Sequence, residues 1–276
     1  MKRDYKKTAT KIRELCVKTL YKSQSAHMGS NLSCADLLAV LYGGVLRVKP
    51  ANPGWQGRDR FVMSKGHGCL AVYAALALKG FFPVKWLDTY YQNNGKLAGH
   101  MTSHGVPGVD ASTGSLGHGL SMGCGMALAA KRDNKNYRVF VLMSDGELDE
   151  GSSWEPILFA PHHKLDNLVA IVDYNKIQSF GRIKEVLDLE PLVEKWKAFG
   201  WAVKEIDGHN VDEIEKVLKV IPFRNGKPSC VIAHTIKGSG GDTACDIFED
   251  KLEWHYRNVD EEIYKRAIEL LSKEKM

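Results

Sequence analysis

Two groups of polar residues carry oxygen-bearing side chains that together suit a metal ion. The first is Ser144-Asp145-Gly146-Glu147, and the second is Asp173-Tyr174-Asn175. A carboxylate and an amide oxygen are donors that Mg²⁺ or Ca²⁺ prefers, with water, phosphate oxygens and a backbone carbonyl filling the other positions. Gly146 lets the backbone approach a phosphate closely, so that nearby N–H groups can bind it. The pattern therefore predicts a metal and phosphate site.

The elements that must position these groups are two apolar strands joined by a helix. Residues 137–144 and 168–173 read as buried strands, and residues 152–163 read as the helix between them. A βαβ unit of this kind pairs its strands in parallel. Ligands bind at the carboxyl ends of such strands. We therefore expect Asp145 and Asn175 to converge on one point.

The same alternation continues along the chain and predicts an α/β fold. We expect a doubly wound, mostly parallel sheet with helices on both faces, in a single domain over residues 1–276. A polar loop is expected at 24–31, and a long irregular segment rich in glycine and histidine at 95–119. Ser33 is expected to cap the second helix. The other expected helices are 6–22, 35–46, 69–79, 120–132, 190–199, 211–220 and one from about 260, and the other strands are 60–64, 201–206 and 229–234.

Composition and charge exclude several classes of protein. The formal charge of +5 is too small to indicate a nucleic-acid-binding surface. Residues 69–78 form the longest apolar run, which is too short to span a bilayer, and the N-terminus lacks the apolar core of a signal peptide. The six cysteines form no CxxC pair, which is typical of reduced thiols. We therefore expect a cytoplasmic protein that binds neither nucleic acid nor membrane.

Six short motifs, in order, resemble the N-terminal part of a transketolase, a thiamine-diphosphate enzyme. The resemblance extends from about residue 20 to about residue 255. The motifs are Ala26-His27-Met28-Gly29, Ser64-Lys65-Gly66-His67-Gly68, Gly99-His100, Gly114-Ser115-Leu116-Gly117-His118-Gly119, the SDGE run at 144 and the DYNKIQ run at 173.

The resemblance implies a thiamine-diphosphate-binding fold, of which this chain is the diphosphate-binding domain. Mg²⁺, or Ca²⁺, would be held by Asp145, Asn175 and the backbone carbonyl of Ile177. Gly146 and His67 would contact the diphosphate. The segment Gly114, Ser115, Leu116 would line the aminopyrimidine ring.

The resemblance also implies roles at the sugar end of the site. His27, His100 and His255 would meet the hydroxyls of the donor sugar and move protons, which suits histidine near neutral pH. Glu150 matches a glutamate at the subunit interface near the cofactor.

The chain departs from the family pattern at several positions. Ser144 replaces a glycine, Ser115 and His118 replace proline and glutamine, and Tyr256 replaces the glycine after His255. His100 and His104 have the spacing of zinc ligands on a helix, but the glycines around them argue against a helix there.

In the family, a second α/β domain grips the aminopyrimidine and carries the activating glutamate. We therefore expect the partner to be a separate C-terminal transketolase subunit, in a symmetric α2β2 assembly that acts on sugar-phosphate substrates. Two alternatives stay open. One is a component of another thiamine-diphosphate enzyme, of the E1 or deoxyxylulose-phosphate-synthase type, and the other is a noncatalytic diphosphate-binding subunit.

Overall fold

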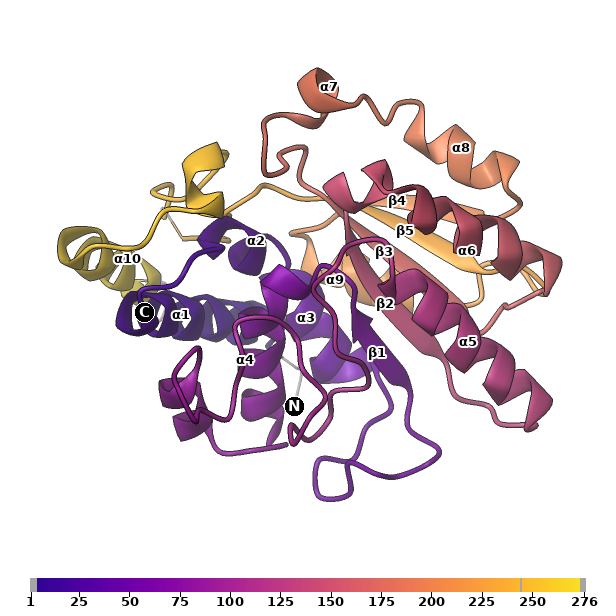
Figure 1. Cartoon of the computed structure of the whole chain (residues 1–276), viewed down its shortest axis with the longest axis horizontal. Coiled ribbons are helices and arrows are strands. Elements are labelled where there is room, and N and C mark those ends of the chain that lie inside the picture. Colours follow the sequence, from indigo (N-terminus) through magenta and orange to yellow (C-terminus); the bar gives the residue numbers. More distant parts are fainter. Residues whose placement is uncertain (1–3, 244, 274–276) are drawn as a thin grey trace.

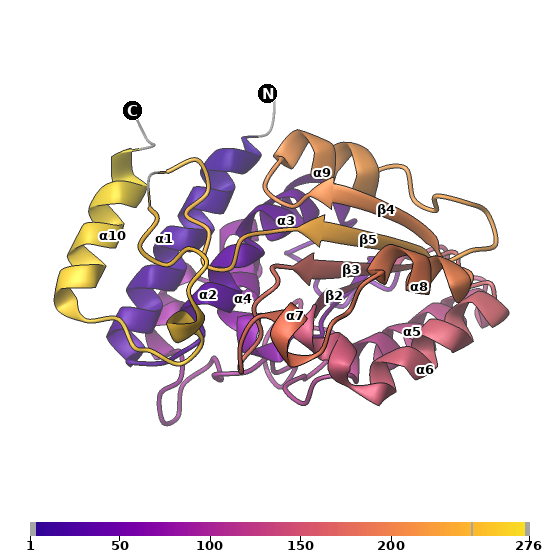
Figure 2. The ribbon, with the colours of Figure 1, turned by 90° about the horizontal axis from the view of Figure 1, so that it is seen from above.

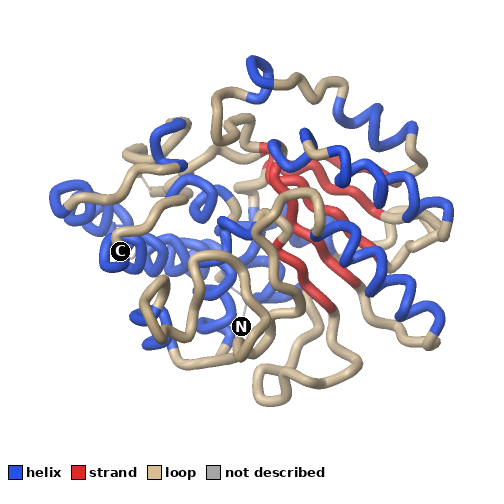
Figure 3. Tube along the Cα trace, viewed as in Figure 1, coloured by secondary structure: helices blue, strands red, loops and turns tan. Residues whose placement is uncertain are grey.

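The computed structural model describes residues 4–243 and 245–273, and its centre is one parallel β-sheet (Figures 1 and 3). The strand order is β1-β2-β3-β5-β4, and every neighbouring pair is parallel. This confirms the expected mostly parallel sheet. The strands are β1 Arg60–Met63, β2 Val139–Ser144, β3 Leu168–Tyr174, β4 Ala202–Asp207 and β5 Ser229–His234.

Each face of the sheet is covered by its own apolar core, as a doubly wound sheet requires. Successive side chains of a strand point to opposite faces. In β2, Phe140 and Leu142 pack in one core, whereas Val139 and Val141 pack in the other. The first core includes side chains of α1 Tyr5–Ser23, α3 Ala35–Val40, α4 Cys69–Lys79 and α9 Val211–Leu218, and the second those of α5 Gly119–Arg132, α6 Gly151–His162 and α8 Leu192–Ala198 (Figure 1).

Helix α10 (Glu261–Lys273) lies beside α1 at the edge of the molecule (Figure 2). The rings of Tyr21 and Tyr264 stack at 4.2 Å between their centroids. Ala267 and Leu271 turn inward and complete the first core.

The segment expected to be a polar loop at 24–31 is partly helical, because α2 (Met28–Ser33) begins inside it. Asn31, at the end of this segment, is buried and bonded: its Nδ2 donates to the carbonyl of His27 at 2.8 Å, and its Oδ1 accepts from the N–H of Ala71 at 2.9 Å. The prediction that Ser33 caps a helix is wrong. Its hydroxyl donates instead to the buried carboxylate of Asp173 at 2.6 Å, and Cys34 precedes α3 without a side-chain cap.

The helix expected at 35–46 is two elements, because α3 ends at Val40 and a π-helical turn covers Leu41–Val45. Several short helical turns were not expected from the sequence. They are α7 Ile183–Val186 and the 3-10 turns Gly66–Gly68, Val84–Thr89, Gly146–Asp149 and Leu252–His255.

The irregular segment at 95–119 is confirmed, since α5 begins only at Gly119 and no strand is assigned before it in that segment. It is held by specific bonds. The hydroxyl of Thr113 donates to the carbonyl of Met63 at 2.6 Å, and the N–H of Thr113 donates to the carbonyl of Met101 at 3.0 Å. The segment thus folds back on itself beside β1, so that Gly114 lies against the ring of His100.

Candidate active site

The two oxygen-bearing groups leave the sheet on neighbouring strands. Ser144, the last residue of β2, is in register with Asp173 of β3. Asp145 follows directly and is buried. Its carboxylate accepts hydrogen bonds from the N–H of Gly146 at 2.7 Å and of Lys176 at 2.5 Å. The predicted convergence of the two strand ends is therefore confirmed.

The carboxylate of Asp145 lies in an environment that suits a cation. Burial raises the pKa of this carboxyl to about 7, and the nearby charge of Asp173 adds to the effect. No salt bridge to Asp145 is found among the described residues. The positive charge of Lys237 lowers this pKa but does not outweigh burial. A buried carboxylate that is not paired is costly, and a bound cation reduces that cost.

The other two predicted metal-binding groups line the same cavity as Asp145. Asn175 Oδ1 accepts from the N–H of Ile177 at 3.2 Å, and the Ile177 carbonyl accepts from Lys237 Nζ at 2.7 Å. Within residues 4–243 and 245–273, no group of three His, Cys, Asp or Glu side chains could hold a metal. A metal here would need further oxygen ligands, and a diphosphate and water supply these to Mg²⁺.

The cavity has a volume of about 230 Å³ and brings together most of the predicted site. Ser115 and Glu150 do not line it and are both exposed, Glu150 at the start of α6. A larger hollow of about 480 Å³ beside α1 has no histidine in its lining. The predicted residues that line the smaller cavity are His27, His67, His100, Gly114, Leu116, Asp145, Gly146, Asn175, Ile177 and His255.

Four histidines from distant parts of the chain meet in this cavity. The ring of His27 lies 5.4 Å from that of His67, 5.8 Å from that of His100 and 5.1 Å from that of His255, between centroids. The N–H of His27 donates to the carbonyl of His255 at 3.1 Å, which joins the start of α2 to the C-terminal segment.

Three of these rings have a lowered pKa. Burial, then His100 and Lys237, lower the pKa of His27 to about 4. Burial and Lys237 lower the pKa of His255 to about 3, and burial lowers that of His67 well below its usual range. These three imidazoles are therefore neutral near pH 7. A neutral imidazole can both donate and accept a hydrogen bond.

His27 is held ready for a ligand at some cost to the fold. Its backbone is left-handed, with φ 73° and ψ 27°, which is uncommon for a residue with a side chain. Its Nδ1 atom is buried and has no hydrogen-bond partner. A buried polar atom without a partner is rare in proteins and indicates that a ligand group completes the site.

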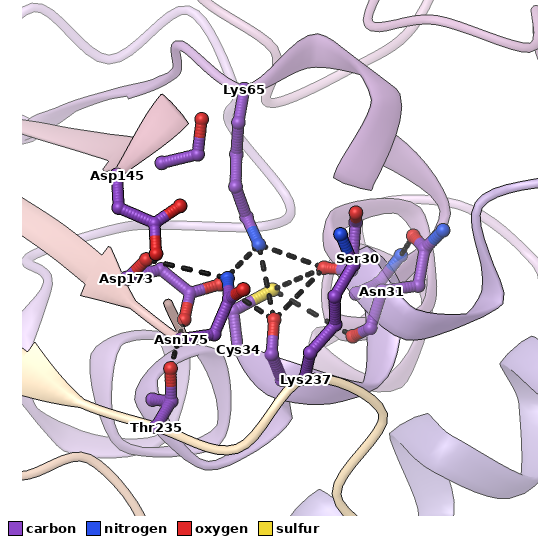
Figure 4. Close-up of polar contacts among 12 residues, drawn as sticks. Ser30, Asn31, Cys34, Lys65, Asp145, Asp173, Asn175, Thr235 and Lys237 are labelled. Carbon is purple, nitrogen blue, oxygen red and sulfur yellow. Dashed lines mark hydrogen bonds and ion pairs between the residues drawn. The ribbon is translucent and has the colours of Figure 1, made fainter. Parts of the chain in front are cut away.

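A buried ion pair that the sequence analysis did not assign supports the cavity. Lys65 and Asp173 form a salt bridge, and the two side chains point toward each other in Figure 4. Burial alone would raise the pKa of Asp173, but the Lys65 ammonium lowers it. Lys65 Nζ also donates to the carbonyl of Ser30 at 2.7 Å. The pair thus joins β3 to the turn after β1 and to α2.

Lys237 is a second lysine that sequence reasoning missed. It is buried, lines the cavity, and its Nζ donates to His255 Nδ1 at 3.1 Å. Burial lowers its pKa to about 8. The signal was present in the sequence, since Lys237 comes three positions after the end of β5, which pairs with β3. Ligands bind at the carboxyl ends of parallel strands, and this holds for β5 as it does for β2 and β3.

The other lining residues without a predicted role are small or polar, apart from Tyr256. They are Ser30, Ser144, Gln178, Ser179 and Tyr256. Glu147 lies behind them, where its carboxylate bonds the hydroxyl of Ser64 and the N–H of Gly117, the latter at 2.9 Å. Glu147 therefore fixes the glycine-rich 114–119 loop to the end of β2.

Comparisons with known proteins agree with this geometry. Residues 5–251 match the family model described as transketolase, thiamine diphosphate binding domain. The chain is 44% identical over 271 residues to the 6-deoxy-6-sulfo-D-fructose transketolase subunit SqwG of Clostridium sp. (strain MSTE9), covering 98% of this chain and 97% of that one. It is 42% identical to one of the apulose-4-phosphate transketolase subunits of Phocaeicola vulgatus, covering 95% and 92%.

Among solved structures, the transketolase of Campylobacter jejuni superposes with a TM-score of 0.88 at 32% identity. That match covers 97% of this chain but 42% of the longer transketolase. The chain therefore belongs to the transketolase family, and it is similar over nearly its whole length to proteins named as transketolase subunits.

Proposed function

We propose that this chain is the diphosphate- and metal-binding half of a two-chain transketolase, built as a single domain. The enzyme moves a two-carbon ketol unit from a ketose phosphate to an aldose. One observation carries the proposal: the histidine cluster and the Asp145, Asn175 and Ile177 groups line the same cavity. This juxtaposition puts hydroxyl-binding groups beside a place for a metal and its phosphate ligand.

The residues present fit thiamine diphosphate with Mg²⁺. Asp145, Asn175 and the Ile177 carbonyl would hold the metal, and Gly146 and His67 would contact the diphosphate. A Cβ atom at position 146 would lie 2.8 Å from Cβ of Gln178, which is too close. Glycine at this position therefore avoids a clash and leaves the backbone accessible to the diphosphate. The segment Gly114 to Leu116 would line the aminopyrimidine, with Ser115 facing outward. When bound, the cofactor supplies the nucleophilic carbon and the electron sink of the reaction.

The histidines act on the sugar. His27 and His255 are neutral near pH 7, so each would donate or accept hydrogen bonds with hydroxyl or carbonyl oxygens rather than carry a charge. Lys237 donates to Nδ1 of His255, which leaves the ring proton on Nε2. His255 then serves as a neutral hydrogen-bond donor, and the three rings of His27, His100 and His255 surround the hydroxyls between which protons move.

The partner completes the site. We propose that a separate C-terminal subunit supplies the pyrimidine-binding domain and the activating glutamate, in an α2β2 assembly. Glu150 is exposed beside Gly117, on the rim of the glycine-rich loop, where a partner subunit can reach it. We place the complex in the cytoplasm. All six cysteines are buried and free, and no helix in the described part of the chain is long and apolar enough to cross a membrane.

The relatives suggest the substrate class. Their names give 6-deoxy-6-sulfo-D-fructose and apulose 4-phosphate, which are ketoses with an anionic group at the far end. We propose a donor of that class for this chain.

The decisive experiment is calorimetric titration of thiamine diphosphate with Mg²⁺. We would use the chain alone, the chain copurified with its neighbouring-gene product, and both after EDTA. Binding that requires Mg²⁺ and tightens with the partner supports the proposal. Binding that is absent even in the copurified complex contradicts it and favours a noncatalytic subunit.

A further inference from the structure

Tyr256 is an exposed aromatic residue on a firmly held piece of backbone. Its side chain is 61% exposed. Its N–H donates to the carbonyl of Glu253 at 3.1 Å. On one side, Trp254 is buried and its Nε1 donates to the carbonyl of Ile247 at 3.1 Å. On the other, the guanidinium of Arg257 lies 5.0 Å from the centre of the Trp254 ring. The position of the tyrosine is thus fixed while its ring remains accessible.

The ring stands at the edge of the histidine cluster. Its centroid is 4.7 Å from that of His255 and 6.5 Å from that of His27, and Tyr256 lines the cavity. No hydrogen bond to its hydroxyl is found in the part of the chain that the structure describes. An aromatic ring beside a binding cavity offers a rigid, partly apolar surface to a ligand.

We propose that Tyr256 determines specificity by packing its ring against the far carbons of the donor sugar. This inference rests on the proposed function. The ketol end of the donor must lie at His27 and His255, so the carbons beyond it leave the cavity on its open side. The Tyr256 ring is the large exposed side chain in the lining of that cavity. It therefore favours donors long enough to reach it.

Two donors of different length separate this role from others. With a five-carbon ketose phosphate such as xylulose 5-phosphate, the C2–C3 bond breaks and a three-carbon aldose phosphate leaves. With hydroxypyruvate, the bond to the carboxylate breaks and CO2 leaves. Both give the same ketol unit to the acceptor, but hydroxypyruvate has no carbon beyond the carboxylate and ends before the ring.

The test compares Tyr256→Ala, Tyr256→Phe and Leu252→Ala in the complex copurified with the partner. Leu252 begins the 3-10 turn that Tyr256 follows and is exposed, but it does not line the cavity. We expect Tyr256→Ala to lower kcat/KM for the ketose phosphate about tenfold, mainly through KM, since an aromatic contact of this kind contributes on that order. Turnover of hydroxypyruvate and the calorimetric affinity for thiamine diphosphate stay unchanged. Tyr256→Phe and Leu252→Ala behave as the unaltered complex.

An equal loss with both donors overturns the inference, because the ring then supports the histidines rather than the far carbons. Weaker copurification of Tyr256→Ala with the partner also overturns it and assigns the ring to the subunit contact. A failure of the proposed function gives a different result, because the unaltered complex would then transfer a ketol unit from neither donor. That result would also overturn the inference.

Discussion

The carboxylate of Asp145 accepts a hydrogen bond of 2.5 Å from the backbone N–H of Lys176. This bond ties the turn after β2 directly to the turn after β3. We propose that Asp145, which accepts this bond, and Asn175, which directly precedes Lys176, both bind the metal. The two ligands are therefore held at a fixed separation before any metal arrives.

Asp145→Asn removes the negative charge but keeps the shape of this connection. We expect the Mg²⁺-dependent affinity for thiamine diphosphate to fall by about 100-fold or more, because an amide is a much weaker ligand for a hard cation than a carboxylate. Calorimetry of the copurified complex measures this. Asp166→Asn, which alters a partly exposed carboxylate before β3, is the control. Unchanged affinity in Asp145→Asn places the metal elsewhere.

The buried pair of Lys65 and Asp173 supports the fold beneath the site. Lys65→Met leaves Asp173 as an uncompensated buried carboxylate. We expect the free energy of unfolding to fall by about 3–5 kcal/mol, measured by urea denaturation of the chain. Lys131→Met breaks a more exposed pair with Asp166 and is expected to change stability little. Equal effects of the two variants would show that burial of the Lys65 pair has no special importance.

A second buried pair, Arg13 with Asp36, links α1 to α3. Burial alone would raise the pKa of Asp36, but Arg13 and a hydrogen bond from His209 lower it to about 2. A carboxyl whose pKa is lower in the folded state stabilises the fold above its unfolded pKa of about 3.9, and that stability is lost as the pH falls toward 2.

Asp36→Asn should therefore destabilise the chain at pH 7. The difference in stability between the variant and the unaltered chain should become smaller as the pH falls from 4 to about 2. Thermal unfolding of both proteins over this range measures the difference. Asp88→Asn, at an exposed pair with Lys22, controls for loss of a surface charge. A disadvantage that is constant with pH would mean that the pKa of Asp36 is the same in the folded and the unfolded protein.

The low pKa values of His27 and His255 predict a pH profile. Burial first, and nearby cations next, keep both rings neutral down to about pH 5, as their pKa values of about 4 and about 3 require. We therefore expect neither ring to add a falling limb to kcat/KM for the ketose donor between about pH 7.5 and 6, where an unperturbed histidine would titrate. Initial rates of the unaltered complex and of His27→Gln and His255→Gln in overlapping buffers test this. A falling limb centred near 6.5 that either substitution removes would contradict the low pKa values.

Much of the fold followed from periodicity, because buried parallel strands are short apolar runs with clear ends. The register of β2 with β3 brought Asp145 and Asn175 together, as the βαβ rule predicts. The histidines could not be placed this way. His27, His67, His100 and His255 come from irregular or short helical segments, whose path depends on individual bonds such as that of Thr113 to Met63. The sequence analysis assigned them to one site only because of the resemblance to transketolases, and their contacts are seen only in the folded structure.

The predictions that failed concern single residues whose roles depend on distant parts of the chain. Ser33 has the composition of a helix cap, and only the distant carboxylate of Asp173 explains why its hydroxyl points elsewhere. Lys237 follows a strand that was predicted correctly, but its importance depends on β5 lying next to β3 rather than at an edge. Strand order is not encoded in any one segment.

The left-handed backbone of His27 means that this position is a compromise between stability and activity. A glycine there would adopt the same φ freely and would leave no unpartnered ring nitrogen in the interior. His27→Gly should therefore relieve about 1 kcal/mol of backbone strain, but it removes a ring of the site. Screens that select only for thermal resistance would tend to erase this histidine, and with it the part of the cavity that a substrate needs.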